Sequence, residues 1–486
     1  MMRLSPFRTL LLTTSGCLLL AAPLRAETLR EALAAAYENN PTLTGARAGQ
    51  RATDEGVPIA RADGLPSLGA SVGYTEQVLQ ASNSFFNPDR ILSVSGQLTV
   101  PIYQGGVVRN AVRAAETRVE AGQAELRGTE ASVFSQVVGA YMDVLRDEAV
   151  VALNRNNVEV LIVNLQATRD RFDIGDLTRT DVAQSEARLA TARSQLQSVE
   201  ARLIASRESY IRLVGHAPAD LVSPPPLPGL PDVVDAAVES ALADNPDLEA
   251  AQRDADASGF DVRSARGTRM PRLSFGTSGG HSDFLGSVAA PAAPTTTSAT
   301  SSVTMTIPLF QGGRPAARVR QAQARQSQAM ERVIGTERSV IAQTRAAFAS
   351  WRAAGSVAAS SQIAVDANRL SLEGVRAENS VGTRTILDIL NAEQELLNSQ
   401  VQLVTAQRDA YVAGFTLLAA MGRGEAEDIG LDGGTLYDPD TNYARVRGRI
   451  WDWDEDPAPG TVATRTRGTD AQTADVSEKR GPELTP

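Results

Sequence analysis

Hydrophobic and polar residues follow two different periods along this chain. Residues 92–100 (LSVSGQLTV) and 302–307 (SVTMTI) alternate strictly between apolar and polar side chains, and residues 68–75 and 273–280 alternate more loosely. A period of two is that of a β-strand with one apolar face. We therefore expect two strands in each half of the chain, each roughly ten residues long and joined by a polar, proline-containing loop.

Between the strand segments, apolar residues recur at every seventh position. The stretch from 107 to about 172 contains no proline, and one such stripe runs along Val112, Val119, Leu126 and Val133. A helix of this length would extend for about 100 Å at ~1.5 Å per residue. Gly175 ends the stretch, and a second helix is expected to return over 178–214.

The second half of the chain repeats this order. A long helix is expected from 314 to about 379, Gly382 ends it, and Leu390, Leu397 and Val404 mark the returning helix. Two shorter helices, over about 29–62 and 233–266, precede the strands of the two halves. A seven-residue repeat sustained over such lengths predicts left-handed coiled coils built from several helices.

The two halves are copies of one unit. PIYQGG at 101–106 matches PLFQGG at 308–313 with an offset of 207 residues, and NNPTL at 39–43 matches DNPDL at 244–248 with an offset of 205. We therefore divide the chain into a first repeat over 27–223 and a second repeat over 224–423. Each repeat contains a helix, two strands and a long helical hairpin, in that order.

Each hexapeptide is expected to join a strand to a helix. Proline is tolerated at the end of a strand but not within its ladder, and a glycine pair permits a sharp turn. A phosphate-binding loop is the alternative, but the Lys-Ser/Thr pair of such loops is missing. The joint residues are Pro101, Gly105 and Gly106 in the first repeat and Pro308, Gly312 and Gly313 in the second.

Four strands have two open edges, and open edges are not tolerated in lipid. Strands of this length are stable in a membrane only as part of a closed barrel. Three copies would supply 12 strands, and their helices would continue the wall as a hollow cylinder of 12 helical columns. The expected fold is therefore an α+β membrane protein, in which antiparallel coiled coils form a hollow α-barrel and several copies, for example three, complete one transmembrane β-barrel, 12-stranded for a trimer.

The N-terminus and the composition bear on compartment and chemistry. Residues 1–26 have the basic start, the apolar run and a plausible cleavage site of a signal peptide, with an uncleaved anchor or lipidation of Cys17 as alternatives. A formal charge of −10 argues against a nucleic-acid partner. His216 and His281 fit no metal spacing. No nucleophile and base stand together, so we expect no metal, no cofactor and no enzymatic activity.

The chain resembles the TolC-like family of outer-membrane efflux proteins over about residues 27–450. The most specific stretch is ENSVGTRTILDILNAEQELL at 378–397, and RFDIGDLTRTDVAQSEARL at 171–189, PLFQGG and NNPTL add to the likeness. The resemblance implies a homotrimeric exit duct in the lipid of the outer membrane. It also implies two partners, a periplasmic adaptor (membrane fusion) protein and an inner-membrane transporter of the ABC, RND or MFS class.

The resemblance also implies roles at the periplasmic end. The tips of the helical hairpins close the tunnel and meet the adaptor in this family, and a lock would join Arg384 to Thr180 and Asp181. Asp388 matches a pore-facing acid of the family, whereas Asn391 stands where a second acid can occur. The matching tip residues are Gly175, Asp176, Leu177 and Thr178, followed in the second repeat by Val381, Gly382, Thr383 and Arg384.

Helix capping is a structural alternative for the two aspartates. Thr178-x-x-Asp181 and Thr385-x-x-Asp388 both resemble capping boxes, with Asp in place of the usual Glu. The two roles are compatible. Three Asp388 carboxylates around a narrow axis would repel one another and attract cations, so we expect a cation-selective channel.

Residues 424–486 form an acidic tail of net charge −7, expected to be periplasmic and largely disordered after about 457. The expected function is that of a trimeric channel-tunnel, the exit duct of a tripartite efflux or type I secretion system, opened at its tips by an adaptor and a pump. A periplasmic coiled-coil adaptor or structural protein without a barrel is the alternative. The sequence leaves open whether the cargo is a drug or a secreted protein.

Overall fold

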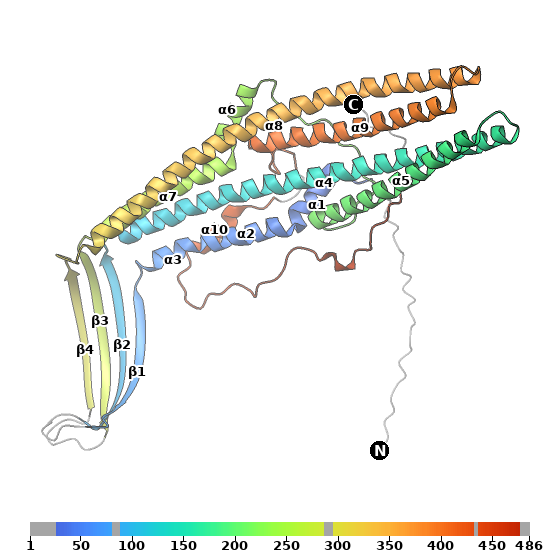
Figure 1. Ribbon diagram of the computed structural model, residues 1–486. Coiled ribbons are helices and arrows are strands. Elements are labelled where there is room, and N and C mark those ends of the chain that lie inside the picture. Colours follow the sequence, from blue (N-terminus) through green and yellow to red (C-terminus); the bar gives the residue numbers. More distant parts are fainter. Residues whose placement is uncertain (1–25, 80–87, 286–294, 432–435, 477–486) are drawn as a thin grey trace, which may run out of the picture.

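The computed structural model describes residues 26–79, 88–285, 295–431 and 436–476. The predicted signal peptide therefore lies outside the described residues except for Ala26, and so does Cys17. The described chain is an elongated bundle of helices with a sheet at one end and two helical hairpin tips at the other (Figure 1). None of the described helices is both long enough and apolar enough to cross a membrane.

The order of helices and strands is similar in the two halves of the chain. The first half contains α1 (Leu29–Asn39), α2 (Pro41–Asp54), α3 (Gly56–Ala62), β1 (Ser67–Glu76), β2 (Arg90–Tyr103), α4 (Val107–Asp173) and α5 (Arg179–Val214). The second half contains α6 (Val234–Asp244), α7 (Pro246–Gly267), β3 (Arg272–Leu285), β4 (Thr295–Thr306), α8 (Arg314–Ser380) and α9 (Ile386–Ala420). Both long helices, α4 and α8, have 67 residues, so each spans about 100 Å.

The prediction of one continuous helix before each pair of strands was wrong. Pro41 and Pro246 each start a new helix, because proline lacks the N–H that an uninterrupted helix would need. The asparagine before each proline has extended backbone and caps the new helix. Asn40 accepts hydrogen bonds from the next two backbone amides, and Asn245 does the same. A second break at Glu55 separates α2 from α3.

The same two asparagines tie each leading helix to the end of the returning helix. Asn40 Nδ2 donates to the carbonyl of Leu213 at 2.9 Å, and Asn245 Nδ2 donates to the carbonyl of Ala420 at 3.1 Å. Leu213 and Ala420 are themselves 207 residues apart. Since the last carbonyls of a helix have no partner within it, the repeated motifs NNPTL and DNPDL satisfy one such carbonyl in each half.

The four strands form one antiparallel sheet in the order β1-β2-β3-β4, which leaves β1 and β4 as its edges. Residues opposite each other in adjacent strands point to the same face. Val72, Val94 and His281 share one face, together with the rows Leu68–Leu98–Thr277 and Val100–Phe275–Val303. The prediction of long helices with four alternating strands is confirmed.

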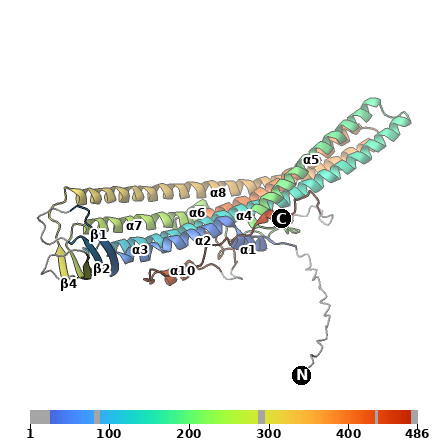
Figure 2. The same ribbon diagram turned by 90° about the horizontal axis from the view of Figure 1, so that it is seen from below.

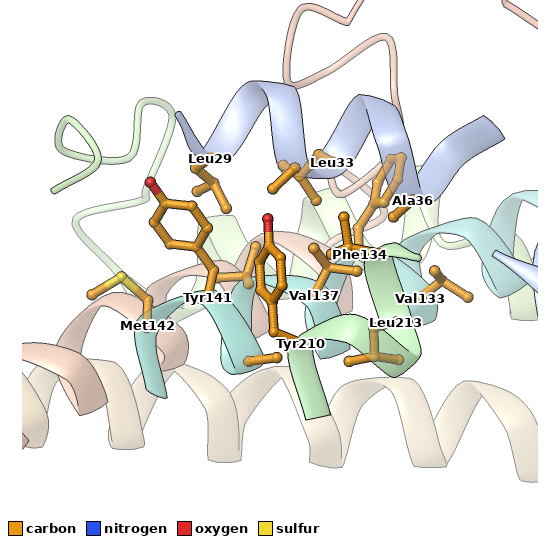
Figure 3. Packing of buried hydrophobic residues seen from close by; sticks show 14 of the residues in the cluster. Leu29, Leu33, Ala36, Val133, Phe134, Val137, Tyr141, Met142, Tyr210 and Leu213 are labelled. Carbon is orange, nitrogen blue, oxygen red and sulfur yellow. The ribbon is translucent and has the colours of Figure 1, made fainter. Parts of the chain in front are cut away.

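The largest hydrophobic cluster among the described residues lies where α1, α4 and α5 meet (Figure 3). Figure 1 shows that α1 and α5 lie well away from the sheet. Phe134, Tyr141 and Tyr210 are completely buried there. The Tyr141 hydroxyl lies 2.6 Å from the carbonyl oxygen of Val222 and 2.9 Å from that of Glu27, to which it donates. This core therefore fixes the start of α1 against the base of the first hairpin.

The C-terminal segment packs along the outside of the helices. It forms α10 (Pro439–Val446) beside α2, and Asn442 donates to the buried Asp54 at 2.6 Å. The trace then turns back towards the base of α5 (Figures 1 and 2). Residues 457–476 were predicted to be disordered, but they are described here and their last five residues contact α4 and α5.

Candidate functional site

The two hairpin tips have the same backbone turn. Gly175 and Gly382 both adopt a φ of 84°, a left-handed conformation that favours glycine. The amide of Gly175 donates to Phe172 O at 2.9 Å, and the next amide donates to Arg171 O at 2.9 Å. Equivalent bonds of 3.0 and 3.1 Å close the second tip. This pair of bonds is a Schellman motif, so the tip residues predicted from the sequence form two rigid, matching turns.

Both aspartates of the tips cap the helix that follows. Asp181 Oδ2 accepts from the backbone and hydroxyl of Thr178 at 2.8 and 2.7 Å, and Asp388 Oδ2 accepts from Thr385 at 2.9 and 2.8 Å. The Thr178 hydroxyl, followed by its backbone amide, lowers the pKa of Asp181. The backbone amide of Thr385, followed by its hydroxyl, lowers the pKa of Asp388. Both predicted capping boxes are thus formed, and both partly exposed carboxylates are ionised at neutral pH.

In each tip, an arginine side chain also forms an ion pair with a carboxylate of the same hairpin. Arg171 Nε donates to Asp176 at 2.7 Å in the first tip, and Arg384 Nε donates to Glu378 at 2.7 Å in the second. The Glu378 carboxylate raises the pKa of the Arg384 guanidinium. Within one chain, therefore, the structure pairs Arg384 with its own hairpin and does not bring it to Thr180 or Asp181. The lock between those residues stays a prediction.

Further from the tips, the two hairpins contact each other through Asn391, which was a predicted site residue, and Glu393, which was not. Arg188 on α5 donates to Asn391 Oδ1 on α9 at 2.7 Å, so Asn391 holds the two hairpins together. Glu393, two residues further along α9, is 6 % exposed. It accepts from Asn164 of α4 at 3.0 Å and from Arg376 of α8 at 3.0 Å. The sequence signal for this contact between the hairpins is a glutamate, Glu393, at a buried position of the heptad repeat marked by Leu390 and Leu397.

The strand–helix joints contain the predicted glycine turns but differ from each other. Gly105 and Gly106 have φ values of 64° and 79°, and Gly312 and Gly313 have values of 61° and 78°. A β-carbon on Gly105 would lie 2.6 Å from the Gly267 carbonyl oxygen, whereas one on Gly312 would meet nothing within 4 Å. Both prolines were expected to stand at the end of a strand, but the structure places them differently relative to their strands.

Pro101 lies within β2, opposite Ser274, and the register shifts directly after it. Pro308 follows β4, which ends at Thr306. A proline is therefore accommodated near the end of β2 by an irregularity in the ladder, because its nitrogen has no hydrogen to donate. Both prolines still mark the point at which regular strand pairing stops.

The two faces of the sheet differ in chemistry. Ser71 and Ser95 lie opposite each other on the second face, with their hydroxyl oxygens 2.8 Å apart, and Gly280 and Ser298 continue that row. From the row of Ser93 to the row of Thr99, this face contains only serine, threonine, glycine and Gln97. An uncharged hydroxyl surface thus lies opposite a mostly apolar face, which also carries His281 and Asp283. Among the described residues, no cluster of three or more His, Cys, Asp or Glu side chains could hold a metal ion.

Comparison with known proteins agrees with this architecture. A family model described as "outer membrane efflux protein" matches residues 32–216 and 237–423, one match in each half of the chain. The chain is 33 % identical over 434 residues to outer membrane efflux protein BepC of Brucella suis biovar 1, which covers 89 % of this chain and 93 % of BepC.

Two more distant proteins share the same organisation. Outer membrane protein TolC of Escherichia coli K12 is 26 % identical over 420 residues, covering 83 % of this chain and 84 % of TolC. The crystal structure of the Campylobacter jejuni CmeC outer membrane channel superimposes with a TM-score of 0.73 at 16 % identity, covering 86 % of this chain and 89 % of CmeC. Because the sequence identity to CmeC is only 16 %, this structural likeness shows the fold alone.

Proposed function

The chain belongs to the outer membrane efflux protein family, and from that premise we propose that three copies assemble into one duct that spans the outer membrane and reaches into the periplasm. As a family member it is an outer-membrane efflux channel with a periplasmic helical extension, of the kind used in tripartite efflux and type I secretion. Such channels are transport proteins and not enzymes.

The sheet is the observation that supports the trimer. It has a mostly apolar face, an uncharged polar face, and unpaired edges at β1 and β4. In lipid, every backbone N–H and C=O must be paired, so β4 of one copy needs β1 of the next. Three sheets of four strands close a barrel of 12 strands with the apolar face towards lipid and the hydroxyl face towards the lumen.

At the other end, the hairpin tips are the proposed gate and adaptor-docking site. The matching turns at Gly175 and Gly382 present short ends, and Asp388 carries a partly exposed negative charge. The partners implied are a periplasmic adaptor protein and an inner-membrane transporter of the ABC, RND or MFS class. Since the tips of three chains would meet around one axis, three Asp388 carboxylates would form an acidic ring that favours cations.

A planar-bilayer experiment tests the acidic ring. Asp388→Asn removes the charge but keeps an oxygen for the cap on Thr385, whereas Thr385→Ala weakens the cap and leaves the charge. We expect the reversal potential in a salt gradient to shift away from cation selectivity in D388N and to stay close to the parent value in T385A. Equal selectivity in D388N and the parent protein would refute the ring.

Light scattering in detergent and cell fractionation test the assembly itself. A trimer has a protein mass about three times that of the mature chain and is recovered with the outer membrane. Recovery of a monomer in the soluble periplasm would instead support the alternative of a coiled-coil adaptor or structural protein.

The phenotype of a strain that lacks this protein identifies the class of cargo. Loss of one secreted protein with normal tolerance to dyes, detergents and antibiotics would indicate type I secretion. Loss of tolerance with a normal set of secreted proteins would indicate drug efflux. Loss of both would mean that one duct serves several pumps.

A further inference from the structure

The last described residues of the chain lie along the outside of the first hairpin. Arg207 of α5 donates to the carbonyls of Thr473 and Asp475 at 2.5 and 2.9 Å, and Arg155 of α4 donates to the carbonyl of Ala474 at 2.9 Å. Three consecutive backbone carbonyls are therefore bound by two guanidinium groups. Because these contacts reach the backbone, they recognise an extended peptide more than any particular side chain.

The two arginines are held in place by carboxylates from the opposite helix. Arg155 Nη2 lies 2.8 Å from Glu200 Oε1 on α5, and Arg207 Nη2 lies 2.8 Å from Glu148 Oε1 on α4. Each ion pair thus crosses the hairpin, and the terminal guanidinium nitrogens also donate to the peptide. The Arg207 side chain is only 12 % exposed. Burying a charged group is costly unless it is paired and hydrogen-bonded, and the tail supplies two partners to Arg207, whose Nε has none.

The side chains of the tail alternate as in an extended strand. Gln472, Ala474 and Val476 are partly buried, whereas Ala471, Thr473 and Asp475 are exposed. Ala474 and Val476 pack against the main hydrophobic core of the molecule. The backbone N–H of Gln472 also donates to Glu208 Oε1 at 3.4 Å. Apolar contacts at every second residue fix which way the peptide lies, and the arginines fix its position along the helices.

The second hairpin lacks this site, although it is a copy of the first. With the offset of 207 residues, the four charged positions of the first hairpin correspond to Gly355, Gln362, Gln407 and Gly414. Charged pairs that only stabilised a coiled-coil hairpin would be equally useful in both copies. Their restriction to the hairpin that the tail contacts points to the tail as the reason for them.

We propose that Arg155 and Arg207, held by Glu200 and Glu148, form a docking site for an extended peptide whose resident occupant is residues 472–476 of the same chain. The docked tail acts as a strap: its carbonyls bind one arginine from each helix, so it fastens α5 to α4 near the base of the hairpin. This site is separate from the tips and does not depend on what the channel transports.

Cross-linking in the full-length assembled protein tests the occupant. Glu208→Cys and Gln472→Cys are combined and treated with a short bis-maleimide, with each single-cysteine variant as a control. We expect a 208–472 cross-link within one polypeptide, identified by mass spectrometry of the digest. Adding Ala474→Asp, which puts a charge against the core, should lower the yield at least threefold. Ala471→Asp, on the exposed side, should not change it.

The strap is tested by hydrogen exchange on the same two aspartate variants. Ala474→Asp should raise exchange of the α5 amides over 200–210 at least threefold, and Ala471→Asp should leave it unchanged. Three results would overturn the proposal: a 208–472 cross-link found only between two chains, a yield insensitive to both Ala474→Asp and Arg207→Ala, or α5 exchange that does not respond when the tail is released. Arg202→Ala, an exposed arginine on α5, is the matched control for Arg207→Ala.

Discussion

Asn40 and Leu213 are joined by a hydrogen bond of 2.9 Å from the Asn40 side-chain nitrogen to the Leu213 carbonyl. The oxygen of the same side chain accepts from the backbone amides of Thr42 and Leu43 at 2.9 and 3.4 Å. One buried asparagine therefore starts α2 and ends α5. Its counterpart, Asn245, makes the same three contacts in the second half, which explains why the motif occurs twice.

Substitutions at Asn40 should separate these two roles. Asn40→Ala removes both and should destabilise the base of the hairpin by about 1–3 kcal/mol, the usual cost of a lost cap and an unpaired buried carbonyl. Asn40→Asp keeps the cap but loses the donor, so it should also destabilise. The measurement is hydrogen exchange of the last turn of α5. Asn39→Ala, which loses only a bond within α1, is the control, and an Asn40→Asp protein as stable as the parent would show that only the cap matters.

The two glycine joints should respond differently to the same change. Gly105→Ala introduces a β-carbon 2.6 Å from the Gly267 carbonyl and 2.5 Å from the Met270 β-carbon. Gly312→Ala meets only the strain of a left-handed conformation, which costs about 1–2 kcal/mol. We expect Gly105→Ala to lower the thermal midpoint and the yield of assembled protein much more than Gly312→Ala. Equal losses would mean that conformation alone sets the cost at both joints.

Stability should depend on pH through Glu425. This side chain follows α9, only 16 % of it is exposed, and burial raises its pKa to about 7 despite the nearby Arg127. A carboxyl whose pKa is higher in the folded protein contributes stability below its unfolded value of about 4.5, and this contribution is lost as the pH rises through about 7. At pH 8 the cost is about 3 kcal/mol, since one pKa unit corresponds to about 1.4 kcal/mol.

Glu425→Gln should therefore stabilise the protein at pH 8 and have little effect at pH 4. Thermal unfolding of both proteins at several pH values measures this difference. Glu455→Gln removes a charge from an exposed position in the C-terminal segment and serves as the control for net charge. A benefit of Glu425→Gln that persists at pH 4 would contradict the titration.

The junction at Glu393 should matter more than its copy in the first hairpin. Glu393 is buried and binds both Arg376 and Asn164, whereas Glu186 binds Arg169 at 2.6 Å with about half of each side chain exposed. Glu393→Ala should cost about 1–3 kcal/mol, because it leaves charged and amide donors without a partner. Glu186→Ala should cost less than about 1 kcal/mol, as for other exposed ion pairs.

Hydrogen exchange of α9 in the first case and of α5 in the second measures these costs. In the Glu393→Ala protein, the amides of α9 near the tip should exchange about 5- to 150-fold faster, the range that 1–3 kcal/mol implies. Similar effects of the two substitutions would show that the link to α4 adds nothing to the hairpin's own ion pair.

Much of this architecture is encoded in short stretches of sequence. The strands follow from alternation over 92–100 and 302–307, the tips from Gly175 and Gly382, and the helix starts from Thr178 and Thr385. Each of these signals depends on a residue and its neighbours within one turn. Each signal also occurs twice in the sequence, once in each half of the chain. Such local rules are the same wherever the segment lies in the molecule.

Contacts between segments far apart in the chain are seen only in the tertiary structure. Nothing near Arg155 or Arg207 in the sequence indicates residues 473–475 as their partners, and composition alone predicted that the tail would be disordered. Asn391 likewise stands in the place of an acid, yet its neighbour proves to be Arg188 on another hairpin. The strands, the hairpin tips and the capping boxes at Thr178 and Thr385 can be predicted from the sequence, because backbone hydrogen bonding and side-chain periodicity are local, whereas the helix breaks at Pro41 and Pro246 were missed. The packing of the hairpins against each other and the course of the tail were decided only when the fold placed distant charges and carbonyls within a few ångströms.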